Sequence, residues 1–189
     1  MNYLAHAFLS DNEPGLLVGN FIADHLGSRY DHLPEHIAKG VILHRKIDSF
    51  TDHHPLFKES KRLFYDGFEK YSGVLIDIYF DHILARNYED YSEKILSHHS
   101  QEIYRTYQDH ISHLPKSSVQ FLEYVLRNDI YNAYATEEGI EKVLYHLSHR
   151  INHGVRLDGS MTIFRKHQDE LEQNFRTFFG EAIQEFKSQ

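Results

Sequence analysis

Four apolar segments of the sequence each carry two polar side chains that are four residues apart. Residues at this spacing lie on the same face of an α-helix, so both members of a pair would point in the same direction. Imidazole nitrogens and carboxylate oxygens on such faces can together bind a divalent cation. The pairs are Asn2 with His6, Asn20 with Asp24, His44 with Asp48, and Asp77 with Asp81.

The pair His44 and Asp48 interrupts an apolar stripe. Ile37 and Val41 begin one face of a helix predicted over residues 34–52, and the next positions of that face are His44 and Asp48. Ionisable groups on the face that should meet the core cost free energy unless they are paired or bound to a metal. A metal site is one explanation for their position.

Asp77 and Asp81 raise the same question, because they lie in the apolar stretch 74–84. The absence of cysteine excludes thiolate ligands and favours Mn, Mg, Fe or Zn in a site of nitrogen and oxygen donors. However, Asp and Glu contribute 28 of the 189 residues and His another 16, so pairs four apart also arise by chance. Spacing alone therefore leaves a metal site and ordinary ion pairs as alternatives.

Closely spaced histidines also occur outside these four segments. They fall in polar, amphipathic segments or at the ends of predicted helices, where side chains usually face water. We therefore predict that they are solvated. They are His53 with His54, His98 with His99, and His110 with His113.

Helical signals dominate the sequence. The four prolines, at positions 14, 34, 55 and 115, stand where helices can begin or end. Neither a sustained polar–apolar alternation nor an Asn-Gly or Asp-Gly hairpin signal indicates strands. We expect an all-α, single-domain helical bundle over residues 1–189. The predicted helices cover residues 2–9, 14–26, 34–52, 55–67, 72–87, 92–113, 117–128, 137–152 and 160–186.

Charge and hydropathy narrow the classes of function. The formal net charge of -8 argues against non-specific binding to nucleic acid, which needs a basic surface. The apolar runs are far shorter than the roughly 20 residues that span a bilayer, so we expect no membrane insertion. The start of the chain lacks the basic residues and apolar core of a signal peptide. Together with the absence of cysteine, these features predict a cytoplasmic protein.

The polar pairs belong to longer motifs that form a recognisable series, most of it before residue 85. The series comprises Asn2 to His6, Gly19 to Asp24, His44 to Asp48 with Thr51, Asp52 and Pro55 after it, Asp77 to His82, and, more weakly, Arg150 to Leu157. In its order and spacing it resembles the acyl carrier protein phosphodiesterase family, also called acyl carrier protein hydrolyase.

The resemblance implies a reaction and a cofactor. The reaction is hydrolysis of the phosphodiester that joins 4′-phosphopantetheine to a serine of holo acyl carrier protein, which yields apo acyl carrier protein. The cofactor is Mn or Mg, and the implied fold is HD-domain-like, distantly similar to the histidine–aspartate metal phosphohydrolases. We expect five residues around the metal: Asp24, His44, Asp48, Asp77 and Asp81.

Other residues receive supporting roles in the expected mechanism. His82 or His6 would protonate the leaving alkoxide as a general acid. Arg45, which follows the central histidine, would stabilise charge that develops on the phosphoryl oxygens. Asn20 would orient Asp24 from outside the ligand set.

Docking of the carrier raises a problem of charge, because acyl carrier proteins are acidic and this chain is acidic as well. A local basic patch would solve it. Lys58, Lys61 and Arg62 lie three and four residues apart on one predicted helix, and Arg150 with Arg156 forms a second candidate. An ordinary solvated charged face is the alternative reading of both groups.

Two other functions stay open at this point. A metal phosphohydrolase that acts on a nucleotide or another small phosphoester would use the same metal-binding residues. A non-catalytic helical binding protein would keep the fold without a tightly held metal. The oligomeric state, the metal and the metal count are not determined by the residues.

Overall fold

The computed structural model describes residues 2–11, 13–27, 30–151 and 154–187, and in these ranges the chain is helical with no strand. The predicted all-α fold class is confirmed. The α-helices are α1 (Tyr3–Phe8), α2 (Pro14–Ile22), α3 (Glu35–His53), α4 (Pro55–Arg62), α5 (Tyr65–Phe68), α6 (Ser72–Arg86), α7 (Leu96–Asp109), α8 (Lys116–Arg127), α9 (Ile130–Ala133), α10 (Glu137–Arg150), α11 (Met161–Lys166) and α12 (Gln168–Lys187). Short 3₁₀ turns join them: η1 (Ala23–His25), η2 (Glu69–Tyr71), η3 (Tyr88–Asp90), η4 (Ile111–His113) and η5 (Leu157–Ser160).

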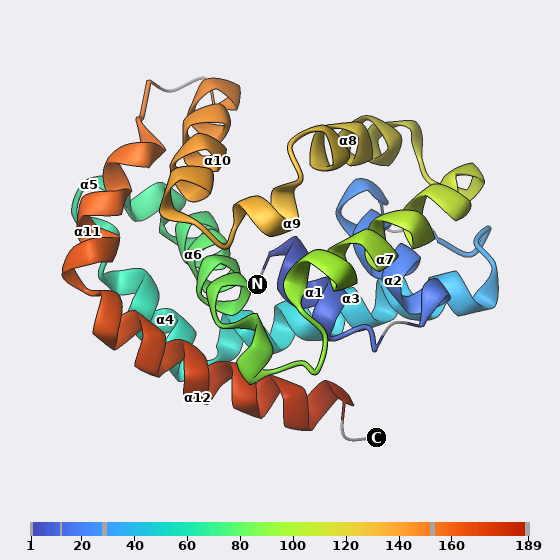
Figure 1. Ribbon diagram of the computed structural model, residues 1–189, viewed down its shortest axis with the longest axis horizontal. Coiled ribbons are helices and arrows are strands. Elements are labelled where there is room, and N and C mark those ends of the chain that lie inside the picture. The colour runs from blue at the N-terminus through green and yellow to red at the C-terminus, as the bar shows by residue number, and fades with distance from the viewer. Residues whose placement is uncertain (1, 12, 28–29, 152–153, 188–189) are drawn as a thin grey trace.

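Helix α6 lies at the centre of the apolar core. It packs against α1, α4, α10 and α12, and most of its residues from Leu75 to Ala85 are buried. Figure 1 shows α12 running along one side of this assembly to the C-terminal end, while α7 and α8 lie on the opposite side. None of the described helices is both long and apolar enough to span a membrane.

Two glycines let α2 and α3 pack with their backbones in contact. A Cβ atom on Gly19 would lie 1.9 Å from the carbonyl oxygen of Ile37, and one on Gly40 would lie 2.5 Å from that of Leu16. Only glycine leaves room for an approach this close. The contact sets Asn20, the residue after Gly19, directly against the middle of α3.

The helix predicted over residues 160–186 is wrong as a single element. The chain breaks at His167, whose backbone N–H bonds to the carbonyls of both Ile163 and Phe164 at 3.1 Å. The break lets Phe164 stack on Tyr79, with ring centroids 4.5 Å apart, while α12 packs its own phenylalanines on the core. Similarly, the predicted helix 92–113 is shortened to α7, and α9 was missed.

Two histidines predicted to be solvated are buried. His54 is 7% exposed, and its Nε2 lies 3.1 Å from Oε2 of Glu181. His99 is 4% exposed and hydrogen-bonds to the hydroxyl of Tyr88. His98 stays exposed while His99 turns inward, because adjacent helical positions point in directions about 100° apart. His54 follows the last residue of α3 with an extended backbone, at φ -66° and ψ 130°, and its ring packs against Phe178.

The close contact between α2 and α3 predicts how substitutions of glycine change the stability of the protein. We expect Gly19→Ala to lower the free energy of unfolding by about 3 kcal/mol or more, because the new methyl group must push the two helices apart. Gly180→Ala is the matched control, since a Cβ there meets nothing within 4 Å in the middle of α12. That change should stabilise the protein by about 0.5–1 kcal/mol. Urea unfolding measures both values, and equal stabilities would contradict the proposed contact.

Candidate active site

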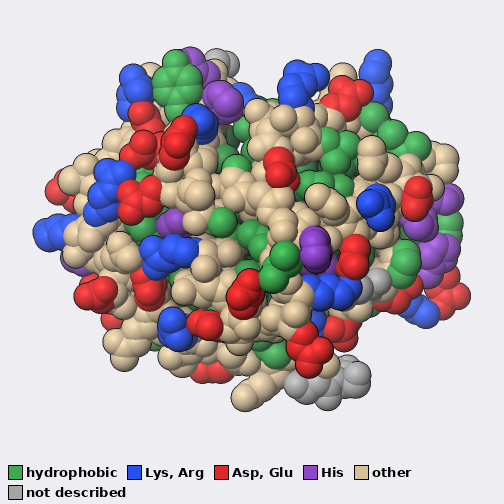
Figure 2. All heavy atoms as spheres, in the orientation of Figure 1, with side chains coloured by type: hydrophobic (Ala, Val, Ile, Leu, Met, Phe, Trp, Pro, Cys, Tyr) green, Lys and Arg blue, Asp and Glu red, His purple; other side chains and the backbone are tan. Residues whose placement is uncertain are grey.

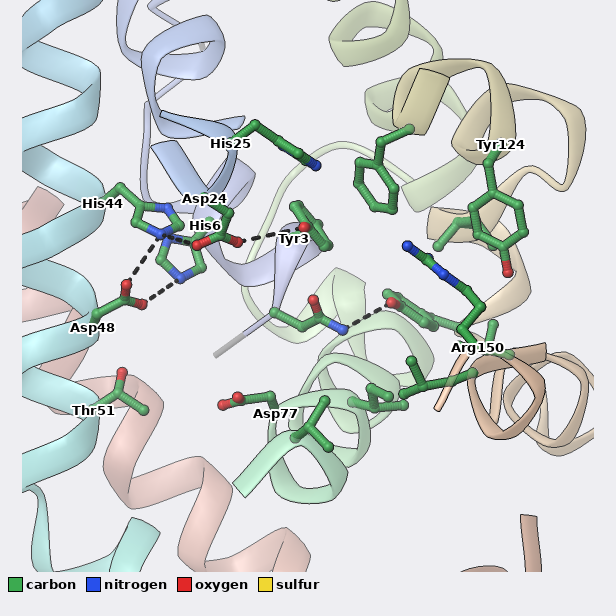
Figure 3. A pocket seen from close by; sticks show the side chains of 18 of the residues that line it. Tyr3, His6, Asp24, His25, His44, Asp48, Thr51, Asp77, Tyr124 and Arg150 are labelled. Atoms are coloured by element: carbon green, nitrogen blue, oxygen red, sulfur yellow. Dashed lines mark hydrogen bonds and ion pairs between the residues drawn. The ribbon is translucent and has the colours of Figure 1, made fainter. Parts of the chain in front are cut away.

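A cavity of about 490 Å³ opens between helices from distant parts of the chain. One end is polar and is lined by side chains from α1, η1, α3 and α6, among them His6, Asp24, His44 and Asp48. The other end is lined mainly by α8, α9 and α10, and Figure 3 shows Arg150 there, across the cavity from His44.

The imidazoles of His6 and His44 are stacked at the polar end, with ring centroids 4.3 Å apart. Both rings turn their Nδ1 atoms towards the same carboxamide oxygen, Oδ1 of Asn20. The Nδ1–Oδ1 distances are 2.8 Å for His6 and 2.9 Å for His44. Asn20 therefore links a residue of α1 to a residue of α3.

Hydrogen bonds on the other side of Asn20 fix the orientation of its amide. Its Nδ2 donates to the backbone carbonyl of His6 at 3.1 Å and to the hydroxyl of Ser10 at 3.0 Å. Since Nδ2 faces acceptors, Oδ1 must be the atom that accepts from the imidazoles. Both rings therefore carry a proton on Nδ1, and both Nε2 atoms face the cavity.

Two carboxylates meet these Nε2 atoms. Oδ1 of Asp48 lies 3.3 Å from Nε2 of His6, and its Oδ2 lies 3.0 Å from Nε2 of His44. Asp24 approaches His44 from the other side, with Oδ1 at 3.1 Å from the same Nε2. The dashed contacts in Figure 3 show this arrangement, in which Tyr3 donates from its hydroxyl to Asp24 at 3.4 Å.

The pKa values of these groups reflect their mutual contacts. Burial by itself would lower the pKa of His44, but its hydrogen bonds with Asp24 and Asp48 outweigh this effect and raise the pKa to about 9. Burial lowers the pKa of His6, although Asp48 opposes the shift. The contact with His44 lowers the pKa of Asp24. Without a metal, one imidazolium is thus held between two carboxylates.

The donor set also fits a divalent cation. Ligand atoms of His6, His44 and Asp48 all lie within 4.8 Å of one another. Ligands bound at about 2.1 Å to a common ion are separated by roughly 3–4 Å, so little movement would be needed. Asn20 supports the same use, because Nδ1–H donation leaves each Nε2 lone pair available for the metal. Asp24 is not part of this group, but its carboxylate lies beside it, 3.1 Å from Nε2 of His44.

The chain matches the sequence model described as acyl carrier protein phosphodiesterase over residues 1–182. It belongs to the acyl carrier protein phosphodiesterase family. Among its relatives, the acyl carrier protein phosphodiesterase of Yersinia pestis is 29% identical over 185 residues, which cover 95% of this chain and 94% of the relative. That of Pectobacterium atrosepticum is 28% identical over 191 residues, which cover 100% and 99%. No solved structure matches the chain, so the expected similarity to HD phosphohydrolases stays a prediction.

Of the residues predicted to bind metal, Asp77 lines the cavity but stands apart from the group of His6, His44 and Asp48. It projects from α6, and Figure 3 shows it on the opposite side of the polar end from Asp24. Burial raises the pKa of its carboxyl group.

Asp81 is placed differently from the prediction. It is fully buried, and its two carboxylate oxygens accept hydrogen bonds from the backbone N–H groups of Leu4 at 2.8 Å and Ala5 at 3.1 Å. The first turn of a helix has N–H groups without helical partners, and Asp81 satisfies two of them at the start of α1. Its carboxylate therefore holds α1, and with it His6, instead of reaching the cavity.

Arg45 and His82 also lie outside the cavity. The guanidinium of Arg45 lies 4.7 Å from the ring centroid of Tyr30 and donates to the carbonyl of Gly27 at 3.3 Å. His82 is fully buried, with Nδ1 at 2.6 Å from the carbonyl oxygen of Tyr134. His6, which was predicted to be a proton donor, instead joins the candidate ligand group.

Sequence reasoning missed the apolar end of the cavity. Its lining includes Phe121, Tyr124, Val143 and Leu147, which follow the same periodicity as core residues of α8 and α10. Nothing in their local sequence separates a cavity wall from a core contact. The sequence predicted Arg150 as part of a weaker family motif and as a candidate for binding the carrier, and gave no indication that it lines this cavity.

The orientation of both imidazoles by Asn20 can be tested directly. We expect Asn20→Leu to weaken the binding of Mn²⁺ by about 10–100-fold, because both Nδ1–H groups lose the acceptor that directs the rings. The matched control is Asn174→Leu, which removes another buried amide, bonded to Ser60 at 3.2 Å and outside the cavity lining. Calorimetric titration with Mn²⁺ measures the affinities. Unchanged affinity in Asn20→Leu would show that the rings are oriented by other contacts.

Proposed function

We propose that this protein is a metal-dependent phosphodiesterase that removes 4′-phosphopantetheine from holo acyl carrier protein. Membership of the acyl carrier protein phosphodiesterase family supports the substrate and makes the chain a phosphodiester hydrolase. The observation that carries the metal dependence is the convergence of His6, His44 and Asp48 at one end of a cavity.

His6, His44 and Asp48, with Asp24 beside them, would bind the cofactor, for which we propose Mn or Mg. The metal would supply Lewis acidity, which activates water and polarises the phosphodiester. The protein would contribute the fixed orientation of these ligands. Asn20 accepts hydrogen bonds from the Nδ1 atoms of both imidazoles, on the side away from the cavity. Asp81 accepts a hydrogen bond from the first turn of α1, the helix that carries His6.

A proton must reach the leaving serine oxygen, and we assign this role to Asp77. Its side chain faces the polar end from α6, across from Asp24 (Figure 3). Because burial raises its pKa, it holds its proton at a higher pH than an ordinary aspartate does. A carboxyl group of this kind is suited to general acid catalysis.

The carrier would dock at the rim of the cavity. Lys58, Lys61 and Arg62 all lie on α4, as predicted. The ammonium group of Lys61 lies 4.0 Å from the position that a Cβ on Gly73 would take, next to Val74 of the cavity lining. Basic and acidic side chains are interspersed over the face shown in Figure 2, so docking would depend on such a local group and not on the overall charge.

Mass spectrometry of holo acyl carrier protein, incubated with the protein and Mn²⁺, tests the function. We expect a mass loss that matches phosphopantetheine. Asp48→Asn should slow the reaction by more than about 100-fold, because the central carboxylate is lost. Asp109→Asn, at the exposed end of α7, is the matched control and should keep full activity.

Other outcomes of this assay would reject the proposal. Unaltered turnover by Asp48→Asn would remove the proposed metal centre. A wild-type protein that leaves the carrier intact but hydrolyses a nucleotide would support the small-phosphoester alternative. Absence of both activities, together with absence of Mn²⁺ binding, would support a non-catalytic binding protein.

The docking surface makes a separate prediction. We expect Lys61→Glu combined with Arg62→Glu to raise the KM for holo carrier about tenfold at low salt, with little change in kcat. The difference from wild type should shrink as salt screens the charges. An unchanged KM at low salt would show that these residues form an ordinary solvated face.

A further inference from the structure

The second end of the cavity has the composition of a ligand site. Phe121, Tyr124, Val143 and Leu147 line it from α8 and α10, and each of these side chains is only partly buried. Apolar surface that faces an open cavity has not been removed from water, so a ligand that covers it gains free energy. The cavity of about 490 Å³ is within the range of roughly 300–1,000 Å³ typical of small-molecule sites.

One charged group accompanies this apolar wall. Arg150 lies at the end of α10, and Figure 3 shows its guanidinium directed into the cavity beside Tyr124. It has no ion pair or hydrogen bond with any residue in the described ranges. Its five N–H donors, together with the Tyr124 hydroxyl, could therefore bind polar acceptors of a ligand that otherwise contacts apolar surface.

On the basis of the proposed function, we propose that this end of the cavity binds the pantetheine arm of the substrate. The arm is a neutral chain with a gem-dimethyl group, two amides and a terminal thiol. Its methyl and methylene groups match the wall of Val143 and Leu147, and its amide carbonyls can accept from Arg150. The phosphate at the end of the arm would then lie at His6, His44 and Asp48.

This placement separates the two sides of the bond that is cleaved. A folded carrier protein is far too large to enter a cavity of about 490 Å³, so the serine side must stay at the rim. The arm is the only part of the substrate that can fill the interior. Leu147 and Val143 then become specificity-determining residues, because they contact the arm without touching the phosphate.

Binding of pantetheine, which lacks the phosphate, tests the site without any reaction. We expect saturable binding to the wild-type protein with a Kd on the order of 1 mM, measured by calorimetry or ligand-observed NMR. Leu147→Gln should weaken it about tenfold, because an amide replaces the apolar contact. Leu126→Gln is the matched control, since Leu126 is also partly buried but lies outside the cavity lining. Circular dichroism establishes that both variants are folded.

Kinetics provide a second measurement. Leu147→Gln should raise the KM for holo carrier about tenfold and leave the hydrolysis of methyl p-nitrophenyl phosphate unchanged, because that diester lacks the arm. Arg150→Met should also raise the KM for holo carrier, which keeps the test valid if Leu147→Gln does not fold. Equal losses on both substrates would overturn the assignment, since they would indicate damage to the polar end.

Failure of this inference can be told apart from failure of the proposed function. If holo carrier loses phosphopantetheine but pantetheine does not bind, or binds equally to wild type and Leu147→Gln, only the arm site is wrong. If adenosine binds at this end and pantetheine does not, the site recognises a nucleoside and the inference is overturned. If the mass of the carrier never changes, the proposed function itself is wrong.

Discussion

The site depends on one carboxamide. Oδ1 of Asn20 accepts hydrogen bonds from His6 and His44, while its Nδ2 is held by the backbone of His6 and by Ser10. Since the amide cannot turn, each imidazole is fixed in one tautomer with Nε2 towards the cavity. The same Nε2 atoms meet Asp48, so the charge and the donor geometry of the polar end both follow from Asn20.

Two packing constraints bring these side chains within reach of Asn20. The glycine contact brings the backbones of α2 and α3 together, and this places Asn20 within hydrogen-bonding distance of His44. The carboxylate of Asp81 holds the first turn of α1 and therefore fixes the position of His6. The buried carboxylate is costly, and burial raises its pKa to about 7 although the two N–H groups oppose the shift. The free-energy cost of burying Asp81 is offset because its hydrogen bonds stabilise α1, a helix of six residues that is too short to be stable alone.

The cavity joins two environments that suit the two ends of one substrate. The polar end gathers imidazole and carboxylate groups, to which we assign the chemistry at phosphorus. Helices α8 and α10 supply apolar surface and the guanidinium of Arg150, which has no ion-pair partner among the residues that the structure describes. Binding energy from a long non-reacting group can position a phosphodiester without contacting it. A cavity of this form would allow the arm to orient the bond while the carrier stays outside.

The sequence by itself determined the helical fold and the faces that carry His44, Asp48 and Asn20, because helical periodicity is a local property. It could not determine that Asp81 would cap α1, because Asp81 is separated from Leu4 by 77 positions of the sequence and from Ala5 by 76. Nor could it distinguish Leu147 from a core leucine such as Leu144, because both belong to the apolar face of α10. Helices α8 and α10 pack around a cavity that their side chains do not fill. This tertiary packing alone decided which of their apolar side chains face the cavity and can contact a ligand.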